Sequence, residues 1–97
     1  MGDLKAHHME TDTTFIYGLK EIGDKPIRYI GKANDPKRRL RKHIQESKLK
    51  NTHKDCWIAS CLKGGNNIEF IIIEEVSLNE WPEREKYWIN YYRIKIN

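Results

Sequence analysis

The chain has 97 residues, of which 33% are charged, and 18 Lys and Arg residues against 14 Asp and Glu residues give a net charge of +4. This length is typical of one small domain, and no segment approaches the length of a membrane span or has the pattern of a secretion signal. Two cysteines make no disulfide framework, so we expect a soluble, cytoplasmic protein. The positive charge suits a polyanionic partner, although many basic domains have none.

The first residues are not interpreted as part of the fold. A second methionine, Met9, follows His7 and His8, which is a pattern typical of a cloning scar. We therefore interpret the two histidines as vector residues rather than metal ligands. We expect residues 1–12 to be a disordered or vector-derived leader, and residues 13–97 to form a single domain.

Two strands come first in the predicted domain. Residues 14–20 alternate with the period of a strand and are rich in β-forming residues. Residues 21–26 are turn formers, and residues 27–32 form the second strand. The two segments predict a β-hairpin.

The register of this hairpin decides where two phenols lie. The second strand is expected to place Ile27, Tyr29 and Gly31 on one face. If Leu19 pairs with Ile27, Tyr17 lies directly opposite Tyr29, with the Cβ atoms roughly 5 Å apart. A slip of one residue would separate the two rings.

A basic helix is predicted next. Asp35 has a side chain suited to an N-cap, and Pro36 is suited to the first helical position, so we expect a helix over residues 36–46. Leu40 and Ile44 lie four residues apart and would contact the core.

Arg39 and His43 form a second stripe on this helix, beside the apolar one. On its own, such an arginine would be solvated, and a lone helix histidine is usually structural or solvated. The remaining basic residues of this region would form a patch for the phosphate backbone of a nucleic acid. These residues are Arg38, Arg41, Lys42, Lys48 and Lys50.

The middle of the chain predicts a second helix and a third strand. Residues 54–63 form the helix, which ends at two glycines. Its inward side chains would be Trp57, Ile58, Cys61 and Leu62. Residues 68–74 are apolar on both faces of a strand, so helices must flank the sheet on both sides. The spacing of a common zinc site is not found among His53, Cys56 and Cys61.

The last helix carries an acid where a core residue is expected. Ser77 and Glu80 have the spacing of a capping box and predict a helix that continues to about Arg93. One face of this helix consists of Trp81, Glu85, Trp88 and Tyr92. Because burying an unpaired carboxylate is costly, Glu85 either ion-pairs with Arg39 or another cation as a structural tie, or binds a metal ion.

Taken in order, these motifs resemble the GIY-YIG nuclease family. Phe15-Ile16-Tyr17 stands for the first half of the signature, and Tyr29-Ile30-Gly31 for the second. The resemblance then continues through Lys32, Arg39, His43 and residues 83–89. It covers nearly the whole domain, with the expected helices and strands between the motifs.

The resemblance implies an α+β fold in which a small three-stranded antiparallel sheet is flanked by helices, in the order β-β-α-α-β-α. It also implies an endonuclease module that hydrolyses a DNA phosphodiester bond with one divalent cation, Mg²⁺ or Mn²⁺. An additional DNA-specificity domain, a partner subunit or DNA shape would then direct the module to its target.

The resemblance also implies roles for individual residues. Tyr17 and Tyr29 would be the active-site phenols, one of which positions or deprotonates the attacking water. Arg39 would hold the scissile phosphate, and Glu85 would bind the cation. His43 would assist proton transfer or contact phosphate.

Two further residues are expected to contact DNA, and two positions depart from the family pattern. Lys32 and His53 would be the DNA contacts, although solvation of Lys32 or helix capping by His53 would also explain them. Phe15 replaces the first glycine of the signature. Many members carry an asparagine after the last helix, and Asn97 comes slightly too early to match it, so the chain is truncated or the role is absent.

Two other functions remain compatible with the sequence. The same fold and basic helix would serve a non-catalytic nucleic-acid-binding domain, in which both tyrosines are core residues with satisfied hydroxyls. A basic protein-interaction domain is the third interpretation, and it predicts no salt-dependent DNA affinity.

Overall fold

A computed structural model describes residues 12–94. Its elements are β1 (Thr13–Glu21), β2 (Ile27–Ala33), α2 (Pro36–Ser47), α3 (His53–Lys63), β3 (Ile68–Ser77) and α4 (Trp81–Tyr91). The predicted order β-β-α-α-β-α is therefore confirmed, and the fold is α+β. The expectations for the leader, save its last residue, and for Asn97 lie outside the described residues. Within residues 12–94, no helix is long and apolar enough to cross a membrane.

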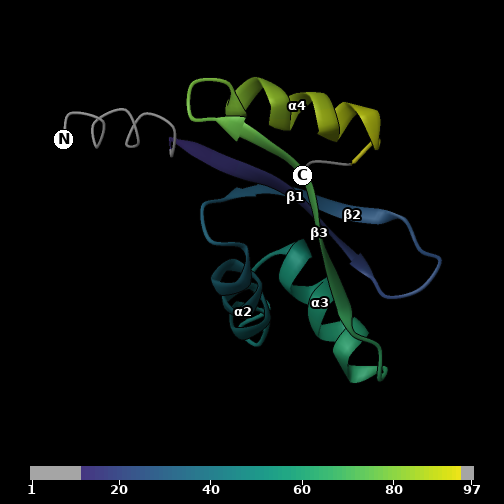
Figure 1. The fold of residues 1–97 in the computed structure, drawn as a ribbon. Helices are drawn as coiled ribbons and strands as arrows, with labels where there is room; N and C mark the ends of the chain where they lie inside the picture. The colour runs from purple at the N-terminus through teal and green to yellow at the C-terminus, as the bar shows by residue number, and fades with distance from the viewer. Residues whose placement is uncertain (1–11, 95–97) are drawn as a thin grey trace.

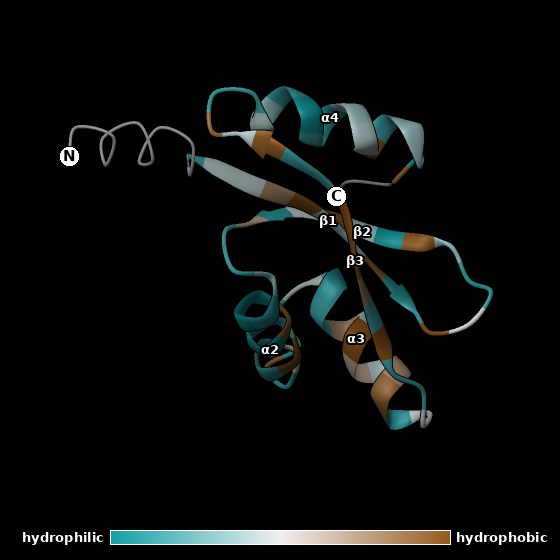
Figure 2. Ribbon diagram, viewed as in Figure 1, coloured by the Kyte–Doolittle hydropathy of each residue, from teal (hydrophilic) through white to brown (hydrophobic). Residues whose placement is uncertain are grey.

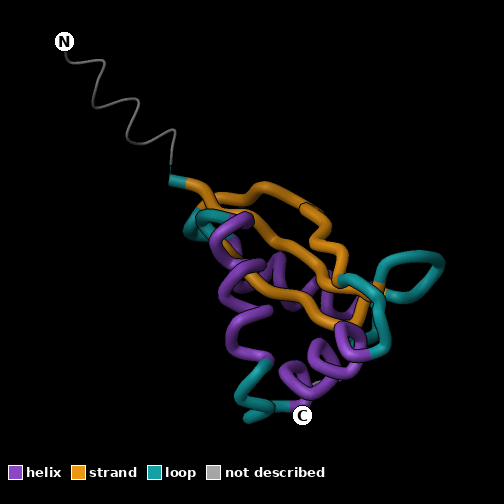
Figure 3. The backbone as a smooth tube through the Cα atoms, turned by 90° about the horizontal axis from the view of Figure 1, so that it is seen from below, coloured by secondary structure: helices purple, strands orange, loops and turns teal. Residues whose placement is uncertain are grey.

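The three strands form one antiparallel sheet in the order β2-β1-β3, so β1 is central and β2 is an edge strand. Helices α2 and α3 cover one face of this sheet, and α4 covers the other (Figure 1). The prediction from residues 68–74 that helices flank both faces is confirmed. Figure 3 shows the strands side by side, with the loop between β1 and β2 extending from one end of the molecule.

Each face of the sheet has its own hydrophobic core. Tyr17 and Leu19 of β1 pack with Ile58 of α3 on one face, and Ile16 packs with Ile30 and residues of α4 on the other. Successive strand residues point to opposite faces, which is how neighbouring residues of β1 enter different cores. The hydrophobic colouring accordingly concentrates along the strands and α3, whereas α2 is largely hydrophilic (Figure 2).

The observed register of the β1–β2 hairpin differs from the predicted one. Tyr17 pairs with Gly31, and Leu19 pairs with Tyr29 rather than with Ile27. The register shifts between Leu19 and the next residue of β1, which pairs with Ile27 and leaves Arg28 as an extra residue in β2. This bulge also places Ile27 against the α4-side core, on the face opposite Tyr29. The predicted pairing was therefore wrong by two residues, because periodicity predicts the face of a strand residue but neither its partner nor a bulge.

Helix α2 begins as predicted. The Asp35 side chain accepts a hydrogen bond from the backbone N–H of Arg38, and Pro36 occupies the first turn. Its fully buried residues, however, are His43 and Ser47. Leu40 packs against the core, whereas Ile44 belongs to neither core cluster, so the prediction for Ile44 was wrong. His43 can be buried on this helix because its imidazole is hydrogen-bonded to the Tyr17 hydroxyl.

Helix α3 matches its prediction closely. Thr52 caps its N-terminus by accepting a hydrogen bond from the backbone N–H of Asp55, so His53 has no capping role. The four residues predicted to face inward are buried or packed against the core: Trp57, Ile58, Cys61 and Leu62.

Helix α4 begins differently from its prediction. Ser77 is the last residue of β3, and the N-cap residue Glu80 makes no side-chain capping bond, so the predicted capping box is wrong. A contact to the sheet holds the helix instead. The carboxylate of Glu74 on β3 accepts hydrogen bonds from Arg84 Nε and Trp88 Nε1, each at 2.9 Å.

Candidate active site

Gly31 allows the two signature tyrosines to share one space. A Cβ atom at Gly31 would lie 2.7 Å from the Tyr17 Oη atom and 3.0 Å from Cε2 of Tyr29. The two rings lie diagonally across the hairpin, with centroids 6.2 Å apart. The tyrosines are thus neighbours even though they are not paired, because only a residue without a side chain can lie between them.

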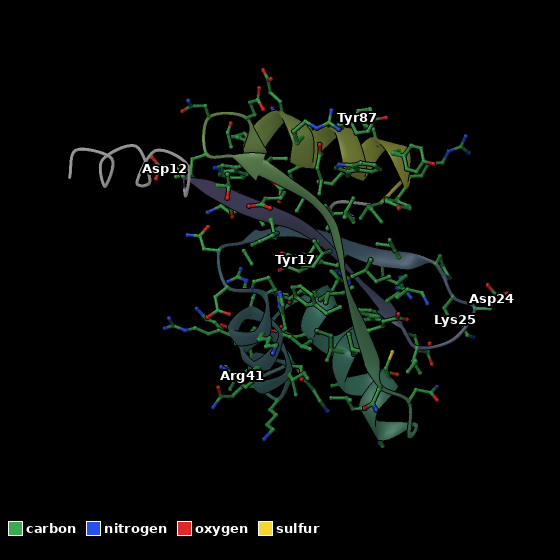
Figure 4. All side chains as sticks on the ribbon, in the orientation of Figure 1. Asp12, Tyr17, Asp24, Lys25, Arg41 and Tyr87 are labelled. Carbon is green, nitrogen blue, oxygen red and sulfur yellow. The ribbon has the colours of Figure 1, made fainter. Side chains whose placement is uncertain are left out.

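The hydroxyl of Tyr17 connects β1 to helix α2. Its Oη atom lies 2.5 Å from His43 Nε2 and accepts a hydrogen bond from Arg39 Nε at 3.5 Å. Tyr17 is fully buried, with its ring stacked on Phe70 at a centroid separation of 4.2 Å. Figure 4 shows Tyr17 between the sheet and the helices below it. The predicted stripe of Arg39 and His43 therefore faces this phenol.

The electrostatics of this cluster favour its neutral form. Burial raises the pKa of Tyr17 to about 12, although Arg39 acts in the opposite direction. Burial, together with the positive charges of Lys54 and Arg39, lowers the pKa of His43 to about 4. At neutral pH the pair is thus a phenol and a neutral imidazole. Arg39 Nε donates to the Tyr17 hydroxyl oxygen, and the direction of the bond between that hydroxyl and His43 Nε2 follows from which imidazole nitrogen carries the proton.

The His43 Nδ1 atom is the exception in an otherwise satisfied cluster. This atom is buried and has no hydrogen-bond partner among residues 12–94. An unsatisfied buried polar atom is costly and is commonly found at functional sites.

Tyr29 differs from Tyr17 in its exposure. It is half-buried and lines a cleft of about 910 Å³ along the edge of β2, between α3 and α4. Burial raises its pKa, Arg39 lowers it, and the negative charge of Glu85 raises it further. Tyr29 is therefore the signature phenol that borders open space, whereas Tyr17 lies behind it.

Glu85 reaches the same cleft from α4, on the opposite face of the sheet. It makes no ion pair within the described residues, so the structural tie to Arg39 is not found there. Burial raises its pKa, and the positive charge of Lys32 partly offsets this effect. A half-buried carboxylate that makes no ion pair with a described residue is a hard oxygen donor, as Mg²⁺ and Mn²⁺ prefer.

The donor set around Glu85 fits a metal ion that has few protein ligands. In the described part of the chain, no three His, Cys, Asp or Glu residues lie close enough together to hold a metal by themselves. Mg²⁺ commonly retains several waters and binds through one or two carboxylates and substrate phosphates. A cation at Glu85 would therefore need oxygen ligands from water and substrate.

A second, basic hollow of about 280 Å³ lies where β2 leads into α2. Its cationic lining consists of Lys32, Arg38, Arg39 and Lys42. Lys32 also lies 4.8 Å above the ring of Trp81, which places its side chain on the α4 face of β2. Arg41 is not part of this hollow, and its side chain lies on the outer side of α2, away from Tyr17 (Figure 4).

The structure adds residues to the site that the sequence did not single out. They lie next to His53, which the sequence did single out and which is exposed and lines the cleft at the start of α3. The next residue, Lys54, places its Nζ atom 5.1 Å from the centroid of the Tyr29 ring. Arg28, at the bulge, covers the ring of Trp57. No sequence signal marks these two cations, because a charged residue facing a cleft looks the same as a solvated one.

The comparison with known families agrees with this geometry. The model of the GIY-YIG catalytic domain matches residues 13–97, which is most of the chain. No curated protein and no solved structure matches at a significant level. Members of the family are nucleases that typically depend on a divalent metal ion, so a nucleic acid is the substrate. The chain belongs to the GIY-YIG family and carries the catalytic domain of an endonuclease.

Proposed function

We propose that residues 13–97 form one domain that hydrolyses DNA phosphodiester bonds with a single divalent cation, Mg²⁺ or Mn²⁺, held by Glu85. The observation that carries this proposal is the meeting of Tyr29 and Glu85 in one cleft, although they belong to opposite faces of the sheet. The negative charge of Glu85 raises the pKa of Tyr29, so this arrangement does not stabilise the fold by itself and is better explained by a bound cation.

Arg39 binds the scissile phosphate in this proposal. Its guanidinium is permanently charged and can make two parallel hydrogen bonds to phosphate oxygens. The neighbouring Lys32, Arg38 and Lys42 contact the adjacent backbone phosphates from the basic hollow. The Tyr17 hydroxyl, held by His43, fixes the orientation of Arg39, so Tyr17 and His43 act as positioning residues.

Tyr29 orients the attacking water from the wall of the cleft. Its raised pKa keeps it protonated at neutral pH, so it directs the water by hydrogen bonding, and the positive charge of Arg39 favours its transient ionisation. Glu85 holds the cation, which supplies Lewis acidity and neutralises charge on the phosphate when bound. Lys54, above the Tyr29 ring, adds further positive potential at the same wall.

The test is nicking of supercoiled plasmid by the wild type and Glu85→Gln, with Mg²⁺, Mn²⁺ or EDTA. We expect metal-dependent nicking that falls by about a hundredfold or more in Glu85→Gln. DNA binding in EDTA should change only a few-fold. Glu83→Gln, an exposed carboxylate in the first turn of α4, is the matched control and should retain activity.

A folded wild type that binds DNA but never nicks it would contradict the proposal. In that case the non-catalytic nucleic-acid-binding interpretation would be preferred. Retained nicking by Glu85→Gln would instead exclude Glu85 as the metal ligand while leaving the nuclease in place. Targeting of so small a module is proposed to come from a further domain or a partner subunit.

A further inference from the structure

The cleft beside Glu85 extends well beyond the residues that the proposed hydrolysis uses. From Tyr29 it continues along β2 to Arg28 and is bordered by Trp57 of α3. The Arg28 guanidinium lies 5.2 Å from the centroid of the Trp57 ring, in a cation–π arrangement. Neither residue lines the basic hollow or bonds to the Tyr17 hydroxyl. Trp57 packs against the core that contains Tyr17, which accounts for its ring, but the proposed hydrolysis does not use the exposed Arg28.

The lining of the cleft combines aromatic rings with positive charge. Its rings are Tyr29, Trp57 and Tyr92, and its cations are Arg28, Lys54 and Arg93. Glu85 is the single acid among the described lining residues. Aromatic and guanidinium planes next to cationic groups are what unpaired bases and their phosphates bind.

The size of the cleft restricts what can enter it. Its volume of about 910 Å³ lies within the range of clefts that bind a small molecule. A base inside a duplex is stacked and paired, and it must leave the stack before a protein pocket can enclose it. The cleft therefore suits a nucleotide that is already unpaired.

The bulge in β2 gives Arg28 its place in this wall. Arg28 has no partner in the β1 register, and it is exposed at the edge of the sheet. One side of its guanidinium covers Trp57, so a base could stack on the other side. The bulge thus turns a strand residue toward the cleft, which is a common use of bulges near binding sites.

We propose that the Arg28–Trp57 end of the cleft binds an unpaired DNA nucleotide. The domain would then prefer DNA with an unpaired nucleotide beside the scissile phosphate over fully paired DNA. This cleavage preference rests on the proposed nuclease function, whereas the binding of the nucleotide does not.

Binding is tested with the full chain in EDTA, with a short thymidine oligonucleotide and a duplex of equal length as probes. We expect the wild type to bind the single strand more tightly, and Arg28→Gln to weaken that binding about tenfold with little effect on the duplex. Arg41→Gln removes one exposed cation on the far side of α2 and should weaken both probes equally.

Trp57→Leu tests the ring itself and should also weaken binding of the single strand. Because Trp57 packs against the core, this variant can fail to fold, and the exposed Arg28 then provides the test. Equal effects of Arg28→Gln and Arg41→Gln on both probes would overturn the proposal, as would duplex binding as tight as single-strand binding. A second arm compares nicking of a paired duplex with one that carries a short bubble. If neither is nicked, the proposed function fails, and the binding arm still decides about the cleft.

Discussion

Gly31 shows how one residue serves both the fold and the site. The glycine pairs with Tyr17 across the hairpin, and the phenol of Tyr17 lies over its Cα. The ring of Tyr29, two residues earlier on β2, also lies close to the position that a side chain at residue 31 would occupy. The two tyrosines of the signature and its final glycine are therefore one packing unit, and a side chain at position 31 would compete directly with a phenol.

Gly31→Ala should displace the Tyr17 ring and separate its hydroxyl from His43 and Arg39. The added methyl group would lie within 2.8 Å of Tyr17 Cζ, which a rigid buried ring cannot accommodate without shifting. We expect a loss of about 1–3 kcal/mol in unfolding free energy and loss of nicking. Urea denaturation and the plasmid assay measure the two effects.

Gly64→Ala is the matched control, because a Cβ atom there would make ordinary contacts of 3.5 Å or more. Its φ angle of −79° is also open to alanine. If both substitutions had the same small effect, the packing role assigned to Gly31 would be incorrect.

At the scale of elements, the position of α4 decides where Glu85 lies. The hydrogen bonds from Arg84 and Trp88 to Glu74 attach the helix to β3, and they lower the pKa of the Glu74 carboxyl. Glu85 follows Arg84 directly and projects toward the other edge of the sheet, where the cleft lies. One side of α4 is thus an anchor, and the other carries the proposed metal ligand.

Glu74→Leu should loosen α4 selectively. Losing the acceptor leaves the Trp88 N–H and the Arg84 guanidinium without their partner, which we expect to cost about 1 kcal/mol, since the cluster is partly exposed. Hydrogen exchange should then show faster exchange across Trp81–Tyr91, with α3 unchanged. Glu75→Gln, an exposed neighbour, is the control. Uniformly faster exchange throughout the domain would contradict an anchoring role.

At the scale of the whole molecule, burial of His43 makes the stability of the fold depend on pH. His43 is 1% exposed, and its pKa of about 4 means that the folded protein resists its protonation. In the unfolded chain the same imidazole titrates near 6.5. The unfolded state therefore binds the proton first as the pH falls.

The contribution of His43 to the free energy of unfolding should thus be fully present above pH 6.5 and should be lost as the pH falls from 6.5 toward 4. For His43 alone, the expected loss of unfolding free energy between pH 7 and pH 5 is about 2 kcal/mol. Urea denaturation of wild type and His43→Gln at several pH values measures it. The difference between the two proteins removes the contributions of the carboxyl groups. A pH dependence that persists unchanged in His43→Gln would contradict the buried neutral imidazole.

The sequence by itself determined the order of the elements and the membership of the family. Strand period, the Asp35 cap, and the aromatic face interrupted by Glu85 are all local patterns, and each lies within one element and its flanking residues. These patterns were sufficient for the sheet with helices on both faces, because an apolar strand needs cover on each side. The capping box before α4 failed as a local pattern, because its serine is the end of β3.

Only the tertiary structure decided how these parts meet. The observed register pairs Tyr17 with Gly31 instead of Tyr29 and includes a bulge at Arg28, and periodicity carries no sign of either. Whether Glu85 would pair with Arg39 or reach the cleft depended on how α4 lies across the sheet. The sequence also did not predict that Lys54 and Arg28 line the cleft, because that depends on how α3 and β2 lie in the fold. Local sequence specifies which surface a residue occupies on its own element, whereas its neighbours depend on contacts between residues far apart in the chain.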